Sequence, residues 1–492
     1  MSRLSNVISD SLRHCPEKEC LADPLVRFTF RELESFINGT AQNLINIGIR
    51  KNDHIAVAVE NSAIYIIVYL ALLKVGAIVV PIDVTLNKNN VDFIVDDCSV
   101  KHIVYSDFTR DLVGKNGLFL QDLVENSDRT VDVEDVAEED TACILYTTGS
   151  TGFPKGVVLR HRNVYASLAN ISKYIKYNSN FRELVPLPLT HSFGLNQVLS
   201  NLLNGGFAYI IKGFGRIKQI LNILEQEQMT CFPGTPTSFR LVMDKYLEHF
   251  KKAGKSLTDI IINSSPLPPK DASLMLKELP NINLIIYYGL TEVSRSTFHT
   301  HSLDLDEKYL SSVGTAAPNV EVAIMDSEGN HLGPNKEGEV IVNSGTLLKE
   351  YWNDPELTEK STINGWFRTG DQGYLDEAGY LFLTGRLKDQ INIGGLKVTA
   401  QEIIRAIESF NEVEEAFVFG VHDDLNGEVP IAFAVLEKNI TKDDLLSRLS
   451  NTLETFKLPR ELYFVDKIPK SETGKILKSK IVDMHKKMTN NA

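Results

Sequence analysis

The segment LYTTGSTGFPKGVVLRH, residues 145–161, carries three glycines, three threonines, a serine and one lysine between two apolar runs. Glycine-rich loops with a lysine commonly bind phosphate through backbone amides and the ammonium group. The segment departs from the common phosphate-loop pattern, because Lys155 is followed by Gly156 rather than by serine or threonine. We therefore expect a phosphate-binding loop of another kind.

The runs on either side of this loop, ACILY and GVVLR, both predict strands. The loop would then join two strands, and no helix dipole would assist in binding phosphate. A plain hairpin turn is the alternative, but turns seldom need so many hydroxyl and glycine positions. The candidate phosphate ligands are the amides freed by Gly149, Gly152 and Gly156, the hydroxyls of Thr147, Thr148, Ser150 and Thr151, and the ammonium of Lys155.

Composition sets outer limits on the class of protein. The 492 residues suffice for more than one domain, and 43% hydrophobic with 23% charged residues is typical of a soluble globular protein. The formal charge of −13 argues against a nucleic-acid-binding protein. The five cysteines are odd in number and lack metal-ligand spacing, which favours a reducing, cytoplasmic environment.

One apolar stretch, AIYIIVYLALLKVGAIVVPI at 63–82, could be taken for a membrane span. Lys74 interrupts it, and Gly76 and Pro81 break any continuous helix. A buried helix followed by a buried strand explains the stretch better, so no membrane span is expected.

Strand-like and helix-like runs alternate along most of the chain, which is typical of parallel sheets covered by helices. The first series has strands at 54–59, 77–82 and 102–105 and helices at 62–74 and 88–97. The second has strands at 183–187, 207–211, 229–232, 259–263 and 283–288, and helices at 163–173, 195–203, 216–228, 236–247 and 269–278. Two series predict two sheets.

The pattern changes after about Val313 to short strands between Gly and Asp turns, as in a small antiparallel β unit. The last part, with helices expected at 399–410 and 441–454, reads as a compact α+β domain. We predict an α/β protein with a large N-terminal domain, 1–386, and a small C-terminal lid domain, 387–492. The expected subdomains of the larger domain are roughly 1–160, 161–312 and 313–386.

The loop YTTGSTGFPKG closely resembles the signature loop of the adenylate-forming superfamily, and further motifs match in the right order over nearly the whole chain. This superfamily contains acyl- and aryl-CoA synthetases, peptide-synthetase adenylation domains and firefly-type luciferases. The resemblance implies that ATP, Mg²⁺ and a thiol are used. It also implies that the C-terminal domain is mobile.

The motif YYGLTE at 287–292 resembles the adenine and magnesium motif of the superfamily. The resemblance implies that Tyr288 stacks on adenine, Thr291 contacts the α-phosphate and Glu292 binds Mg²⁺, for which a hard oxygen ligand is suitable. Asp371 in WFRTGD and Arg386 in GRLKDQINIGG correspond to ribose-binding residues. Further nucleotide positions implied are Thr148, also as a metal ligand, with Ser265, Pro266, Tyr287 and Gly289.

Three lysines and a glycine pair are assigned to the C-terminal domain by the same resemblance. Lys388 falls at the hinge, where some relatives carry Asp, and Lys475 in PKSETGKILK corresponds to the adenylation lysine. Gly394, Gly395 and Lys397 would lie along the thiol channel. Asn392 stands where some thioester-forming members have lysine, so details of the second half-reaction stay open.

The stretch PLPLTHSFGL at 186–195 resembles the region behind the acyl carboxylate. It implies an acyl pocket with His191 as a gate, together with Ser192, Phe193 and Arg295. Members of the superfamily that activate amino acids carry an Asp near this place, and none follows His191, so the resemblance favours a fatty or aromatic acid over an amino acid. Arg295 has two open interpretations: it meets an anionic substrate group, or it pairs with an acid of the fold, because a buried cation needs a partner.

The expected activity is a two-step ligase reaction in which a carboxylic acid becomes an acyl-adenylate and then a thioester. Lys475, Glu292, His191, Thr148 and Lys155 are the expected catalytic residues. The thiol would be CoA or a free-standing carrier protein. A non-catalytic acyl-adenylate-binding protein and a luciferase-like oxygenase are the remaining alternatives, and a homodimer stays open.

Overall fold

The computed structural model describes residues 2–114, 116–147, 154–264, 266–302, 305–393, 396–423, 427–470 and 476–489. Its contacts divide the chain into two compact units. The first unit is Met1–Glu321 with Val342–Phe367, and the second is Val322–Ile341 with Arg368–Ala492. Domain limits at 160, 312 and 386 stay predictions.

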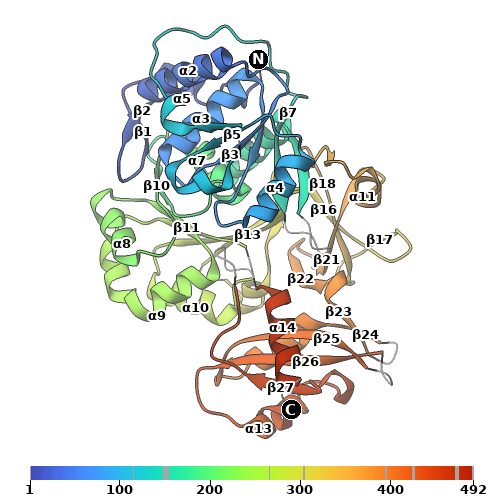
Figure 1. Ribbon diagram of the computed structural model, residues 1–492. Coiled ribbons are helices and arrows are strands. Elements are labelled where there is room, and N and C mark those ends of the chain that lie inside the picture. The colour runs from blue at the N-terminus through green and yellow to red at the C-terminus, as the bar shows by residue number, and fades with distance from the viewer. Residues whose placement is uncertain are drawn as a thin grey trace. The chain divides into compact units, whose positions relative to one another are not determined.

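One sheet of the first unit has seven strands in the order β19-β8-β7-β4-β3-β5-β6 (Figure 1). The strands from β7 to β6 are parallel, whereas β8 runs antiparallel to both β7 and β19. The bounds are β3 (His54–Ala58), β4 (Ile78–Pro81), β5 (His102–Tyr105), β6 (Gly117–Phe119), β7 (Thr141–Thr147), β8 (Lys155–Arg160) and β19 (Glu350–Tyr351). The first predicted series is therefore confirmed, and it gains an edge strand from far along the chain.

The second sheet has nine strands in the order β15-β14-β13-β12-β11-β9-β10-β1-β2, parallel from β13 to β1. The predicted strands form its centre. The bounds are β1 (Glu19–Ala22), β2 (Arg27–Thr29), β9 (Arg182–Val185), β10 (Phe207–Ile210), β11 (Cys231–Gly234), β12 (Asp259–Ile262), β13 (Asn283–Leu290), β14 (Ser294–His301) and β15 (Thr315–Ala316).

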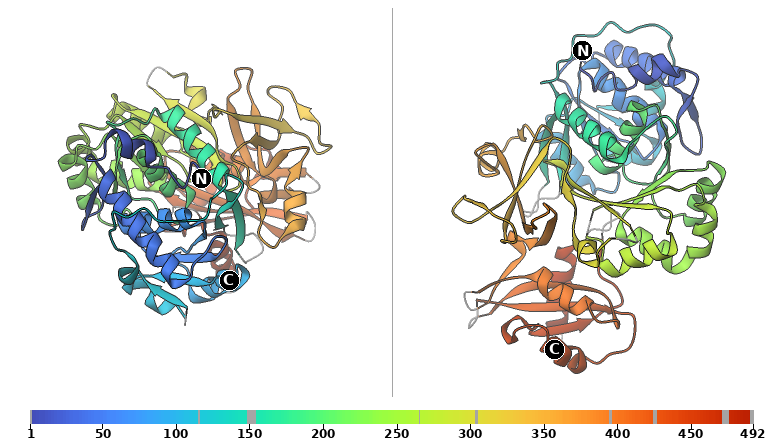
Figure 2. Two further views of the ribbon diagram at one scale, coloured as in Figure 1. Left: turned by 90° about the horizontal axis from the view of Figure 1, so that it is seen from above. Right: turned by 180° about the vertical axis from the view of Figure 1, so that it is seen from behind.

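Two helices lie between these sheets. Helix α6 (His161–Ile175) contacts β7, β8 and β14, while α7 (Ser192–Leu203) packs against α6, β9 and β10 (Figure 2). The other face of the nine-stranded sheet is covered by an apolar layer from α8 (Ile217–Gln226), α9 (Pro236–Ala253) and α10 (Pro269–Glu278). This layering places the N-terminus of α7 near the carboxyl ends of parallel strands, where α/β proteins usually bind ligands.

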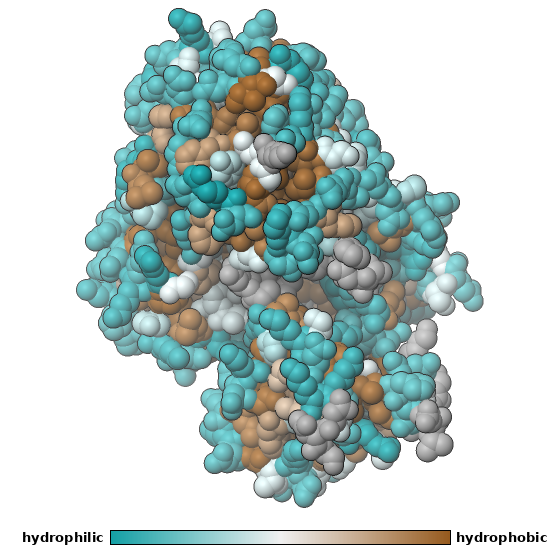
Figure 3. All heavy atoms as spheres, in the orientation of Figure 1, coloured by the Kyte–Doolittle hydropathy of each residue, from teal (hydrophilic) through white to brown (hydrophobic). Residues whose placement is uncertain are grey.

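The apolar stretch at 63–82 forms helix α3 (Ala63–Val75) and β4, as predicted. Ser62 caps the helix through the Tyr65 amide, and Gly76 ends it with a left-handed φ of 80°. The buried ammonium of Lys74 donates to Glu34 Oε1 at 2.7 Å. Within the described ranges, no helix is both long and apolar enough to cross a membrane. The face of the molecule in Figure 3 carries mainly hydrophilic side chains.

The remaining helices of the first unit pack at its edges or are short. They are α1 (Ser9–His14), α2 (Phe30–Ile47), α4 (Lys88–Asp97), α5 (Leu120–Leu123) and α11 (Pro355–Lys360), with the 3₁₀ helices η1 (Asp107–Leu112) and η2 (Glu307–Ser311). Thr29 and Glu32 form a capping box that fixes the start of α2.

A six-stranded sheet follows in the chain, with the order β17-β16-β18-β21-β20 and β22 paired to β21. Its strands are β16 (Val320–Met325), β17 (His331–Leu332), β18 (Gly338–Ser344), β20 (Thr362–Ile363), β21 (Trp366–Leu375) and β22 (Leu381–Arg386). The β16–β17, β20–β21 and β21–β22 pairs are antiparallel, which confirms the predicted small antiparallel unit.

The C-terminal part is the expected α+β structure, a five-stranded sheet in the order β24-β23-β26-β25 with β27 beside β26. Helices α12 and α13 cover one face of the sheet with apolar side chains that include Ile403 and Leu445. Helix α14 covers the other face, where its Ile481 belongs to the same apolar cluster as Phe433 of β26. The elements are η3 (Leu387–Asp389), β23 (Gln390–Ile393), β24 (Leu396–Thr399), α12 (Ala400–Glu408), β25 (Val413–Asp423), β26 (Gly427–Leu436), α13 (Lys442–Leu449), η4 (Thr455–Lys457), β27 (Glu461–Phe464) and α14 (Lys478–Thr489).

Candidate active site

The segment at 145–161 forms a hairpin, as its flanking runs predicted. Strands β7 and β8 pair antiparallel, and the last pair joins Thr147 to Lys155. The Thr147 hydroxyl and the Lys155 ammonium therefore belong to the last paired residues of the hairpin, next to its loop. The other predicted phosphate ligands of the loop, Thr148, Gly149, Ser150, Thr151 and Gly152, lie outside the described residues.

A tyrosine that sequence reasoning missed links this hairpin to the predicted magnesium ligand. Tyr351 on β19 pairs with Val157 on β8, and its hydroxyl donates to Glu292 Oε1 at 2.9 Å. The Nζ atom of Lys155 lies 5.8 Å from the centroid of the same ring. Burial and the Glu292 charge raise the pKa of Tyr351, so its hydroxyl stays protonated and continues to donate.

Backbone contacts fix the turn that carries Glu292. A Cβ atom on Gly289 would lie 1.8 Å from the Ser294 carbonyl oxygen, so only glycine permits this approach of β13 to β14. The Leu348 amide donates to the Glu292 carbonyl oxygen at 2.7 Å. The Thr346 hydroxyl donates to the Val293 carbonyl oxygen at 2.6 Å. The segment around 346–351 thus holds both the backbone and the carboxylate of the turn.

The two tyrosines of YYGLTE are both largely buried on β13. The Asn263 side chain donates to the Tyr287 carbonyl oxygen at 2.7 Å and so ties the end of β12 to β13. Ser264 next to it has a left-handed φ of 86°. Pro266 is exposed, and Ser265 lies outside the described residues. Stacking of adenine on Tyr288 stays a prediction.

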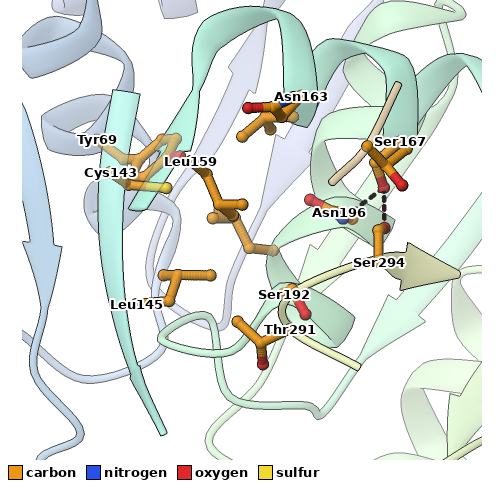
Figure 4. Close-up of a pocket in the computed structure, with 13 residues that line it drawn as sticks. Tyr69, Cys143, Leu145, Leu159, Asn163, Ser167, Ser192, Asn196, Thr291 and Ser294 are labelled. Atoms are coloured by element: carbon orange, nitrogen blue, oxygen red, sulfur yellow. Dashed lines mark hydrogen bonds between the residues drawn. The ribbon is translucent and has the colours of Figure 1, made fainter. Parts of the chain in front are cut away.

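A pocket in the first unit brings together two of the predicted sites (Figure 4). Ser192, from the segment that resembles the acyl site, and Thr291, from the nucleotide motif, line it together. Ser167 accepts from Asn196 at 3.1 Å and is hydrogen-bonded to Ser294, which gives the pocket a polar side. Its lining is completed by Tyr69, Cys143, Leu145, Leu159, Asn163, Val164, Leu195 and Thr346.

His191 lies at the N-cap of α7, and its side chain is 45% exposed. Its Nε2 atom is 3.4 Å from Asp83 Oδ2, a partner that sequence reasoning also missed. Burial raises the pKa of Asp83, but hydrogen bonds from His191 and Thr85 outweigh it and lower this pKa to about 2. The carboxylate therefore holds the imidazole in place, and a gating role for His191 stays a prediction.

The other two predicted acyl-pocket residues, Phe193 and Arg295, both lie beside the Tyr287 ring. The rings of Phe193 and Tyr287 are 5.3 Å apart, and the Arg295 guanidinium lies 4.5 Å from the Tyr287 centroid. Arg295 donates to Gln197 Oε1 at 2.8 Å, and no carboxylate bonds it directly among the described residues.

The predicted ribose-binding pair lies in the second unit. Asp371 on β21 pairs in register with Arg386 on β22, and Arg386 Nε lies 2.8 Å from Asp371 Oδ1. The Asp371 side chain is 6% exposed, whereas that of Arg386 is 47% exposed. A buried carboxylate beside an accessible guanidinium can accept from and donate to sugar hydroxyls.

The remaining C-terminal predictions are placed only in part. Lys388 lies exposed on η3, and its neighbour Asp389 is bonded by Lys478 at 2.8 Å. The backbone of Lys397 pairs with Asn392 in the β23–β24 hairpin. Gly394, Gly395 and Lys475 lie outside the described residues.

The described residues contain no group of three or more His, Cys, Asp or Glu side chains that could enclose a metal ion. Mg²⁺ commonly binds through one or two carboxylates together with substrate phosphates and water. A single oriented carboxylate at Glu292, beside a predicted phosphate loop, fits that mode and does not require a protein cage.

Comparisons with known proteins agree with these features. The AMP-binding enzyme family model matches residues 8–352, and the AMP-binding enzyme C-terminal domain model matches 402–475. A long-chain-fatty-acid–CoA ligase, FadD13 of Mycobacterium tuberculosis, is 31% identical over 92% of each chain. The 2-succinylbenzoate–CoA ligase of Listeria monocytogenes is 27% identical over 98% of this chain and 100% of its own.

Solved structures with the same fold include complexes with the expected ligands. ATP-bound MatB from Rhodopseudomonas palustris superposes with a TM-score of 0.91 at 25% identity, covering 99% of this chain and 100% of its own. The o-succinylbenzoate CoA synthetase of Bacillus subtilis, in complex with its acyl-adenylate, gives a TM-score of 0.86 at 25% identity over 97% of each chain. The chain thus belongs to the AMP-binding enzyme family, and it is an AMP-forming acid–thiol ligase of the acyl-CoA synthetase type.

Proposed function

We propose that this ligase activates a fatty or aromatic carboxylic acid with ATP and transfers the acyl group to CoA. In the first step a carboxylate oxygen attacks the α-phosphorus, and pyrophosphate leaves from an acyl-adenylate. In the second step the CoA sulfur attacks the acyl carbon, and AMP leaves with the carboxylate oxygen. The thiol proton is released to solvent.

The pocket lined by both Ser192 and Thr291 carries this proposal. Ser192 belongs to the segment that resembles the acyl site and Thr291 to the nucleotide motif, so both motifs border the same pocket. An acid and an α-phosphate bound at these residues would therefore be neighbours, which is the main requirement for their reaction. Glu292 follows Thr291 directly and is oriented by Tyr351.

The side chains of the first unit would offset the charge that builds up on the phosphates. Glu292, with Thr148, would hold Mg²⁺, which would neutralise the phosphate oxygens and polarise the α-phosphate. Lys155 would donate to the pyrophosphate as it leaves. Tyr288 and the residues near Pro266 would bind the adenine.

The side chains of the second unit would bind the sugar and complete each step in turn. Asp371 would accept from the ribose hydroxyls and Arg386 would donate beside it. Lys475 would stabilise the transition state of adenylation. Rotation about Lys388 would then exchange Lys475 for the Gly394–Lys397 segment at the thiol channel, as a gating step.

The pocket favours an acid without an ammonium group. None of the residues that line it is acidic, so a cationic amine there would have no counter-ion among them. Leu145, Leu159 and Leu195 give the pocket an apolar side. Relatives named for long-chain fatty acids and for feruloyl-CoA have chemistry of this kind.

CoA is favoured over a carrier protein as the acceptor, because the similar curated proteins are named as CoA ligases or synthetases. A loader of a free-standing carrier protein is the second candidate. The cysteines are all free thiols, which favours a reducing, cytoplasmic compartment. A homodimer stays a prediction.

Acid-dependent exchange between ATP and pyrophosphate tests the first step. We expect exchange with some members of a panel of fatty, aromatic and amino acids, and none with the amino acids. Tight nucleotide binding without exchange for any acid would rule out the ligase mechanism and favour a binding protein. Discharge of the preformed adenylate by CoA, but not by a purified carrier thiol, would select CoA.

The Lys475→Ala variant separates the two steps. We expect it to lose adenylation and still to convert supplied acyl-adenylate to thioester, because the lysine acts only in the first step. Lys486→Ala, which removes an exposed lysine from α14, is the matched control and should retain both. Equal loss of both steps in Lys475→Ala would contradict its assigned role.

A further inference from the structure

Arg295 carries a positive charge in the interior of the first unit. It is 4% exposed, and of its nitrogen atoms Nη2 donates to Gln197 Oε1 at 2.8 Å. Its Nε and Nη1 atoms have no hydrogen-bond partner among the described residues. One face of the guanidinium lies over the Tyr287 ring, and Phe193 lies 5.8 Å away. Buried donors are rarely left without an acceptor, so these two groups point to a bound ligand.

The ionised form of a buried acid near Arg295 can balance its charge. Gln197 joins it to a buried acid, since the Gln197 amide Nε2 donates to Glu183 Oε1 at 2.7 Å. Burial raises the pKa of Glu183 to about 7, because its hydrogen bonds and the Arg295 charge offset only part of the effect of burial. An oxygen surrounded by donors is best matched by the ionised carboxylate. The other donors are Tyr177 at 2.9 Å, Asn201 at 2.5 Å and Cys231 at 3.7 Å.

This balance decides between an anionic and a neutral ligand. A second carboxylate beside Arg295 would leave the buried group of Arg295, Gln197 and Glu183 with a net negative charge, which is costly without water. A neutral oxygen would satisfy the free N–H groups and leave the net charge at zero. The chemistry therefore favours a hydroxyl, ether or carbonyl oxygen.

We propose that Arg295 determines substrate specificity. Its free Nε–H and Nη1–H groups bind a neutral oxygen of the acid, and this oxygen is remote from the reacting carboxylate. The proposal rests on the proposed function and on the prediction that Phe193 and Arg295 belong to the acyl pocket. It narrows the substrate to an oxygen-substituted fatty or aromatic acid. An ordered water on the same two groups is the competing occupant, and it would give no preference among acids.

Two matched series of acids test this on the full-length enzyme. The aliphatic series is decanoic, 10-hydroxydecanoic and decanedioic acid, and the aromatic series is 3-phenylpropenoic acid with hydrogen, hydroxyl or carboxylate opposite the side chain. The measurement is kcat/KM for acid-dependent pyrophosphate exchange. In at least one series we expect the hydroxyl compound to exceed the unsubstituted acid about tenfold or more, because a site built for a polar group discriminates strongly against its absence.

Two substitutions test the origin of the preference. Arg295→Met keeps an unbranched side chain and removes the donors, so the hydroxyl preference should disappear. The double variant Arg295→Met with Glu183→Gln removes both buried charges and guards against misfolding of the single variant. Arg216→Met, at an exposed arginine of the same unit, is the control and should keep the preference.

Glu183→Gln tests the charge balance separately. It leaves Arg295 as an uncompensated cation, so the preference should move about tenfold toward the dicarboxylic acid. Equal use of hydroxylated and plain acids by the unaltered enzyme, or a hydroxyl preference that survives in the double variant, would overturn the proposal and favour bound water. Absence of exchange with every acid would instead contradict the proposed function, and this inference with it.

Discussion

Two hairpins of the molecule carry the charged groups assigned to the nucleotide, and they hold them in different ways. In the β21–β22 hairpin, Asp371 and Arg386 face each other in register and bond directly at 2.8 Å. At the β13–β14 turn, Glu292 has no partner of this kind within its hairpin. It is held instead by Tyr351, 59 residues further along the chain, at 2.9 Å.

The two hairpins differ in which contacts hold the charged side chains in position before the nucleotide binds. The Asp371–Arg386 pair needs only its own strand register, so it is fixed as soon as the hairpin forms. The position of Glu292 depends on β19 having joined the edge of the other sheet through β8. The first arrangement is local, and the second couples the predicted metal ligand to the strand that begins with Lys155.

The largest expected effect comes from removing the carboxylate at the β13–β14 turn. We expect Glu292→Gln to slow pyrophosphate exchange on the order of 10³-fold, because an amide binds Mg²⁺ more weakly than a carboxylate does and offsets less phosphate charge. Exchange at saturating ATP and rising Mg²⁺ measures this effect. Glu356→Gln, on the exposed surface of α11, is the control, and a loss below tenfold in Glu292→Gln would contradict the assignment.

The local pair should give an intermediate effect confined to the nucleotide. We expect Asp371→Asn to raise the KM for ATP about 10- to 100-fold, since hydrogen bonds to a charged group are lost. The KM for the acid should stay nearly constant. Glu412→Gln breaks an exposed ion pair with Arg448 in the same unit and serves as the control. Equal changes in both KM values would indicate a structural role.

The fold could be predicted from the sequence where apolar runs are long and periodic. The strand over 54–59 and the helix over 88–97 are found at β3 and α4, because local pattern and burial agree there. Strands β1 and β19 could not be predicted in this way. They are short, and pairing with distant segments is what makes them strands.

The same limit applies to the candidate site. The roles of Asp371 and Arg386 were predicted from the family resemblance, and the structure adds that the two residues pair across the β21–β22 hairpin. Tyr351, Asp83 and Glu183 could not be found, since each acts on a predicted residue through a contact made only in the folded chain. The prediction for Arg295 allowed an acid of the fold but did not include the glutamine between them.

The smallest expected effect tests the hydrogen bond between Tyr351 and Glu292, which are distant in the sequence. Tyr351→Phe removes the hydroxyl that donates to Glu292 and keeps the ring beside Lys155. We expect the Mg²⁺ concentration for half-maximal exchange to rise about tenfold, as is common when a residue that orients a metal ligand is lost.

The control for this substitution is Tyr65→Phe, which removes a buried hydroxyl without a hydrogen-bond partner among the described residues. It should leave the Mg²⁺ dependence unchanged. If Tyr351→Phe lowers the melting temperature but not the Mg²⁺ response, the tyrosine supports only the packing of β19. A shift in the Mg²⁺ response at unchanged melting temperature would instead show that a residue from the edge of one sheet orients the metal ligand at the end of the other.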